Sequence, residues 1–140
     1  MKTNRYLVTA AALCLAVVAA FSTAVFSQSG REAAETLMTQ YFQALQEGDT
    51  ARLKSLLAGD LLDSRARLLS NPQYADQLRR LYSGAQFSVT RVEPHDHPGY
   101  WRIDTQIKLA AGDVLRARFV AGAPSAGEPL RLYEEQPLFE

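Results

Sequence analysis

Two histidines, the only ones in the chain, lie one residue apart in the stretch EPHDHPGY at residues 93–100. On a straight strand, His95 and His97 would point to the same side and could chelate one metal ion. Imidazole ligands, with a nearby carboxylate as an additional oxygen ligand, suit zinc, nickel or copper. Pro94 and Pro98, however, flank the pair, and proline cannot donate to a sheet ladder. We therefore predict the tip of a β-hairpin, with weak metal chelation by His95 and His97 as the alternative, and we expect no cofactor.

Two adjacent carboxylates near the C-terminus are the next candidates for chemistry. Glu134 and Glu135 lie on the last predicted strand, so their side chains must point to opposite faces. If Leu130 and Leu132 face inward, strict alternation turns Glu134 inward as well. A carboxylate in that position would contact a ligand or pair with an arginine.

The first 27 residues differ in kind from the rest of the chain. Lys2 and Arg5 precede an uncharged, apolar run over residues 6–26, and this order is typical of an export signal. The run is longer than the roughly 7–15 residues of a signal core and close to the roughly 20 that span a bilayer. Residues 1–27 are therefore predicted to be a cleaved signal peptide or a single transmembrane anchor. Either one places residues 28–140 in the periplasm, soluble or held at the inner membrane.

Composition limits the partners of the exported part. Cys14, the only cysteine, lies within the apolar run, so the exported part has no disulfide. Of the 15 basic residues in the chain, Lys2 and Arg5 belong to the leader, which leaves 13 against 15 acidic residues. This balance does not favour capture of nucleic acid or anionic lipid. Membrane contact is expected only through the leader, if it is not cleaved.

Helical periodicity dominates the first half of the exported part. One apolar stripe comprises Ala34, Leu37, Met38, Tyr41, Phe42 and Leu45. Ser29 and Glu32 have the spacing of a capping box, which predicts a helix start near Gly30, and Gly48 predicts its end. Three shorter helices are expected in TARLKSLL, LLDSRARLLS and PQYADQLRRLY, with Asp49 capping the first of them.

From residue 85 the apolar period changes to two. The segments AQFSVTRVE, YWRIDTQIKL, VLRARFVA and LRLYEEQ predict four strands of an antiparallel meander with one apolar and one charged face. Basic residues predominate on the charged face: Arg102, Lys108, Arg116 and Arg118. We interpret this face as a solvated surface or, alternatively, as an interface with a protein partner or a second copy.

A long helix ending in YFQALQEGDTARLKSLL, then short helices, then antiparallel strands resembles the nuclear transport factor 2-like superfamily of cone-shaped, cystatin-like folds. The resemblance covers about residues 31–137 and suggests a small exported bacterial member of unknown function. It implies an α+β domain whose N-terminal helices pack on a curved antiparallel sheet of about four strands. The superfamily includes isomerases, dehydratases, polyketide cyclases and transport adaptors, so the fold alone does not define a function.

The resemblance also implies a cavity between the first helix and the sheet. We expect it to be lined by Tyr41, Tyr74, Phe87, Trp101, Thr105 and Phe119. The predicted inward sheet residues include no acid and no base, so we predict a non-catalytic exported domain. It would bind a small apolar ligand in the cavity or a protein partner, and a homodimer could form through the sheet.

Two alternatives stay open. Tyr41 occupies a position similar to that of the oxyanion-binding tyrosine of ketosteroid isomerases, and a buried phenol can donate a hydrogen bond to an oxyanion. The alternative function is therefore an isomerase or lyase of the ketosteroid isomerase or polyketide cyclase type, with Asp63 or Glu134 as the base. The other is a membrane-anchored accessory subunit of an envelope complex, held by residues 6–26.

Overall fold

The computed structural model describes residues 28–139. The predicted leader lies outside the described residues, so its role in export or anchoring stays a prediction. Within 28–139 there is no helix with both the length and the apolar character needed to cross a bilayer. The chain divides into two units after Glu32. The sheet, the shorter helices and the candidate site all belong to the second unit, which begins at Ala33.

Residues 28–47 are helical and are called the long helix. The predicted apolar stripe is confirmed, since each of its six members from Ala34 to Leu45 is at most 5 % exposed. The helix begins at least two residues before the predicted start near Gly30, because Gln28 and Ser29 are already helical, and Ser29 is therefore not its N-cap. Gly48 ends the helix as expected, with a φ of 65° that favours glycine.

Three short helices follow: α2 (Thr50–Leu56), α3 (Gly59–Leu69) and α4 (Pro72–Tyr82). Asp49 caps α2 by accepting a hydrogen bond from the backbone N–H of Arg52 at 3.0 Å. Asn71 caps α4 in the same way, with Pro72 in the first turn. The N-cap of α3 is Ala58, which has no capping side chain. The backbone N–H of Ala58 instead donates to the carbonyl of Leu132 at 2.9 Å, which joins this helix entrance to the sheet.

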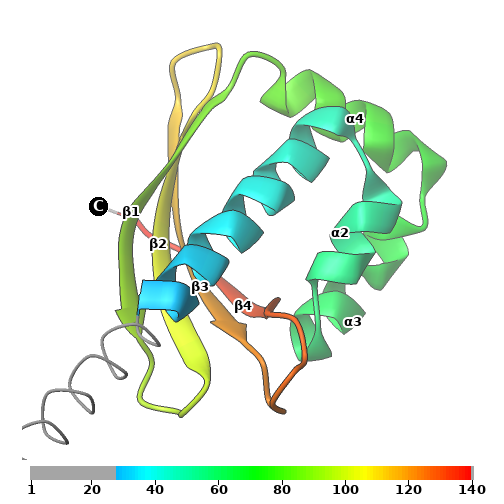
Figure 1. The fold of residues 1–140 in the computed structure, drawn as a ribbon. Helices are drawn as coiled ribbons and strands as arrows, with labels where there is room; N and C mark the ends of the chain where they lie inside the picture. Colours follow the sequence, from blue (N-terminus) through cyan, green and yellow to red (C-terminus); the bar gives the residue numbers. More distant parts are fainter. Residues whose placement is uncertain (1–27, 140) are drawn as a thin grey trace, which may run out of the picture. The chain divides into compact units, whose positions relative to one another are not determined.

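The second half of the chain is a four-stranded antiparallel sheet in the order β1-β2-β3-β4. The strands are β1 (Gln86–Pro94), β2 (Tyr100–Lys108), β3 (Val114–Gly122) and β4 (Arg131–Pro137). Figure 1 shows the helices gathered on one side of the curved sheet. The predicted α+β class and the meander are therefore confirmed.

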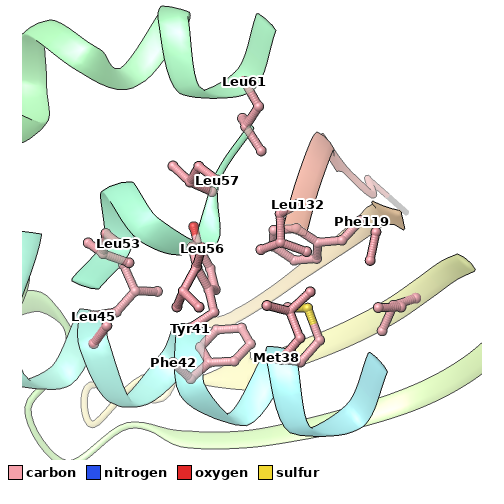
Figure 2. Packing of buried hydrophobic residues seen from close by; sticks show 14 of the residues in the cluster. Met38, Tyr41, Phe42, Leu45, Leu53, Leu56, Leu57, Leu61, Phe119 and Leu132 are labelled. Atoms are coloured by element: carbon pink, nitrogen blue, oxygen red, sulfur yellow. The ribbon is translucent and has the colours of Figure 1, made fainter. Parts of the chain in front are cut away.

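The core lies between the long helix and the inner face of the sheet. Phe119, Met38, Ile103 and Leu132 are its largest fully buried side chains. Figure 2 shows Met38 and Tyr41 on the long helix facing this layer, with the leucines of α2 beside them. Burying these side chains removes apolar surface from water and supplies the main stabilising term of a domain without disulfides.

Two β-bulges interrupt the alternation of the edge strands. On β1 the register shifts between Val89 and Arg91, and on β4 Val120 is paired with Glu134 while Ala121 is paired with Leu132. Each bulge adds one residue and reverses the faces of the residues that follow. The second bulge determines which carboxylate reaches the core side of the sheet.

Candidate functional site

A small cleft opens between the long helix and the inner face of the sheet, and it encloses about 60 Å³. It is lined by Tyr41, Phe42, Leu45, Tyr82, Thr105, Ile107, Leu115, Ala117, Phe119 and Glu135. Most of these side chains are apolar. Leu115 is 43 % exposed and forms part of the rim. We call this feature the cleft.

Tyr41 brings a phenol to the cleft from the long helix. Its side chain is 4 % exposed and packs edge-on against the rings of Phe42 and Phe119, with centroids 5.5 Å away in each case. Within residues 28–139 its hydroxyl has no hydrogen-bond partner. Burial, and then the negative charge of Glu135, raise the pKa of Tyr41 well above its usual range. The phenol is therefore a neutral hydrogen-bond donor in a mostly apolar site.

Glu135, rather than Glu134, is the carboxylate that lines the cleft. The prediction that Glu134 would share the inner face with Leu132 is wrong, because the bulge places an extra residue, Tyr133, between them. Glu135 is paired with the inward residue Phe119, and Glu134 is exposed. A period of two cannot reveal such an insertion, so the sequence pattern gave the opposite face.

Arg65 of α3 forms an ion pair with Glu135 through its Nη2 atom and the Oε2 atom of the carboxylate. Both side chains are partly buried, at 31 % and 23 % exposure. Arg65 itself does not line the cleft. Tyr82 of α4 completes the polar end, and burial followed by the charge of Glu135 raises its pKa. Neither Arg65 nor Tyr82 was among the predicted site residues, because their proximity depends on how α3 and α4 pack.

Of the six residues predicted to line the cavity, Tyr41, Thr105 and Phe119 do line the cleft. Thr105 is 2 % exposed, but its hydroxyl donates to the carbonyl of Ala117 at 3.1 Å and is already satisfied. Phe87 does not line the cleft. It stacks on Phe42 instead, with ring centroids 3.7 Å apart.

Tyr74 and Trp101 pack against the core but do not line the cleft. Asp63 is exposed on α3 and also lies outside the lining. The alternative isomerase function requires Asp63 or Glu134 as a base beside Tyr41. Neither carboxylate lines the cleft with Tyr41.

The histidine segment forms the tip of the β1–β2 hairpin, as predicted, because β1 ends at Pro94 and β2 begins at Tyr100. The backbone N–H of His97 donates to the Nδ1 atom of His95 at 3.0 Å, which engages one of the two ring nitrogens of His95. Within the described residues no three His, Cys, Asp or Glu side chains come together as metal ligands. The rings of both histidines contact Tyr100.

The charged outer face of the sheet carries ion pairs across its strands. Asp104 accepts two hydrogen bonds from Arg118, at 2.7 and 3.0 Å, and these hold the pKa of the Asp104 carboxyl below its usual range. Arg102 lies 3.8 Å from Glu93 on the neighbouring strand. Arg116 and Lys108 are exposed as well. The sheet therefore has the charged outer face that was predicted. Its role as an interface stays a prediction.

Comparison with known proteins finds likeness of fold and none of sequence. No protein-family model matches the chain, and no curated protein matches it. A five-substitution variant of the protein Rd1NTF2_05 is similar in structure, with a TM-score of 0.52, 16 % identity, and coverage of 74 % of this chain and 95 % of that one. The chain therefore has the nuclear transport factor 2-like fold that the resemblance implied.

Two natural proteins of unknown function are more distant. A cystatin-like fold protein from Methylobium petroleophilum gives a TM-score of 0.48 and 13 % identity over 79 % of this chain and 78 % of that one. An NTF2-like protein from Cytophaga hutchinsonii gives a TM-score of 0.37 and 12 % identity over 72 % and 86 %.

Proposed function

We propose that the domain is a non-catalytic binding module that takes one end of a small, mainly apolar molecule into the cleft. Tyr41 would donate a hydrogen bond to an oxygen of that molecule. The observation that carries the proposal is Tyr41, whose side chain is only 4 % exposed yet lines the cleft, and whose hydroxyl has no hydrogen-bond partner within residues 28–139. No fully buried side-chain N or O atom of residues 28–139 lacks a partner, so this hydroxyl is accessible and can donate to a ligand or to water.

The size of the cleft limits what it can hold. Pockets that enclose drug-sized molecules measure roughly 300–1,000 Å³, whereas the cleft encloses about 60 Å³. Only a narrow group, such as the end of a short alkyl chain with its oxygen, is expected to enter. The exposed side chain of Leu115 at the rim would cover part of the remainder.

Binding is favoured over the isomerase alternative by the charges around Tyr41. An isomerase would need a free base and a site that stabilises a developing oxyanion. Glu135 is the only carboxylate of the described residues that lines the cleft, and it is already paired with Arg65. Its charge also opposes negative charge at Tyr41. The same arrangement therefore weakens both requirements for catalysis.

The predicted leader adds a location to the proposal. Residues 1–27 would export the module to the periplasm, where it would be soluble after cleavage or attached as an accessory subunit without cleavage. N-terminal sequencing of the protein purified from a cell envelope distinguishes the two. A first residue near 25–28 supports the soluble module, and an intact N-terminus supports the anchored one.

Titration with 2-hexanone, followed by NMR of the protein, tests the binding function. We expect saturable shifts confined to cleft residues and a roughly 2–10-fold weaker affinity for Tyr41→Phe, the effect of one hydrogen bond. Tyr100→Phe is the matched control, since Tyr100 lies outside the lining and packs against His97 and Tyr133. An unchanged affinity for Tyr41→Phe, or shifts elsewhere, contradicts the proposal.

The same ketone tests the enzyme alternative. In D₂O a base beside an oxyanion donor would exchange the protons on the carbons next to the carbonyl. The binding module predicts exchange at the buffer rate, whereas protein-dependent exchange lost in Tyr41→Phe supports the isomerase.

A further inference from the structure

The lining of the cleft has an unbalanced charge. Glu135 contributes a carboxylate, and none of the ten lining residues is Lys, Arg or His. Arg65, the partner of Glu135, occupies the Oε2 atom and lies outside the lining. Within the described residues the other carboxylate oxygen has no hydrogen-bond partner. A group entering the cleft therefore meets a negatively charged acceptor, while the cation paired with it, Arg65, lies outside the lining.

The two polar groups of the cleft are complementary in kind. The hydroxyl of Tyr41 offers a donor and the free oxygen of Glu135 offers an acceptor, and both line the same space of about 60 Å³. Because the space is so small, we expect one head group inside it to reach both. A carboxamide has one acceptor oxygen and two donor hydrogens, so it can satisfy both partners.

An anion in this position would lose hydration and gain a hydrogen bond from Tyr41, but it would gain no cationic partner in the lining. The cost of burying an unpaired charge is large, and a neighbouring like charge increases it. The environment of Tyr41 agrees with this. At this residue the effect of Glu135, which raises the pKa, is larger than the opposing effect of Arg65. The ion pair therefore leaves a net unfavourable field for negative charge at the phenol.

We propose that Glu135 makes the cleft selective for uncharged ligands with both a hydrogen-bond acceptor and a donor, carboxamides above all, and against carboxylates of the same shape. This inference rests on the proposed function, because it concerns the ligand of the same cleft. In this proposal Glu135 determines the specificity of the cleft, and Arg65 holds the side chain of Glu135 in place.

Hexanamide and hexanoate provide a matched pair of probes, because they share their chain length and differ mainly in charge. The dissociation constants are measured by NMR titration of the purified protein at pH 7. We expect the wild-type protein to bind hexanamide about tenfold or more tightly than hexanoate. In Glu135→Gln, which retains an acceptor for Arg65 but removes the charge, the preference should fall below about threefold.

Two further variants make the result specific. Glu134→Gln removes the same charge from the exposed neighbour, which lies outside the lining, and should leave the preference unchanged. Arg65→Gln removes the compensating cation and should increase the preference for the amide, the opposite direction from Glu135→Gln. Arg65→Gln thus tests the inference even if Glu135→Gln fails to fold.

The outcomes separate the two proposals. Equal affinities for the two probes in the wild-type protein overturn the inference and leave the binding function standing. An unchanged preference in a folded Glu135→Gln variant also overturns it. If neither probe and no ketone binds, the binding function fails, and the inference fails with it.

Discussion

The ring of Tyr100 lies directly over the backbone of Gly122, its registered partner on the neighbouring strand. A β-carbon at Gly122 would lie 2.3 Å from the ring carbons, far inside contact distance. The glycine therefore makes room for the ring rather than for an unusual backbone angle. The ring of Tyr100 also contacts Tyr133, at 5.5 Å between centroids, and so links β2 to the bulge of β4.

Gly122→Ala is expected to destabilise the domain by about 1–3 kcal/mol, because the ring of Tyr100 must leave its position. Urea denaturation followed by circular dichroism measures the change. Combining it with Tyr100→Ala removes the obstacle, so the double variant should lose less than the sum of the single effects. Additive losses would show that the ring of Tyr100 is not the reason why position 122 requires glycine.

Asp49→Ala should cost about 1 kcal/mol of stability, because the N-cap hydrogen bond to Arg52 is lost. Asn at the same position also caps helices well, so Asp49→Asn should retain most of the stability. Chemical denaturation of the three proteins checks this order. Equal losses in both variants would mean that the charge, rather than the cap, stabilises the start of α2.

Tyr41 predicts a loss of stability in alkaline solution. Its pKa is raised in the folded protein, so its neutral form is favoured there, and the unfolded chain ionises first. The associated stability is complete below about pH 10, the usual phenol value, and is lost as the pH rises toward the folded pKa. Denaturation at pH 8 and pH 11 should show a smaller alkaline loss in Tyr41→Phe than in wild type. A Tyr74→Phe control that behaves like Tyr41→Phe would assign the effect elsewhere.

Asp104 predicts the opposite behaviour in acid. The hydrogen bonds from Arg118 lower its pKa in the folded protein, so its contribution is present above the usual Asp value and is lost as the pH falls through the folded pKa. Asp104→Asn should therefore be less stable than wild type at neutral pH, with the difference disappearing between roughly pH 5 and pH 2. Asp96→Asn, at the exposed hairpin tip, is the control and should show no such convergence.

Much of the fold could be predicted from local signals. The helical stripe of the long helix, the caps at Asp49 and Asn71 and the alternation of β2 each depend on residues close in sequence. The start of the long helix could not be located in this way, because the capping-box spacing at Ser29 and Glu32 also occurs inside a helix. Part of the site followed from the same signals, since Tyr41 belongs to the stripe.

The sequence by itself determined the α+β order, the hairpin tip at His95 and His97, and an apolar sheet face beneath the long helix. These features follow from propensities and periods that act over a few residues. Only the tertiary structure decided that Glu135 rather than Glu134 enters the cleft, and that Arg65, 70 residues earlier, is its partner. An inserted residue in one strand leaves no periodic trace, and the meeting of α3 with β4 depends on how whole layers pack.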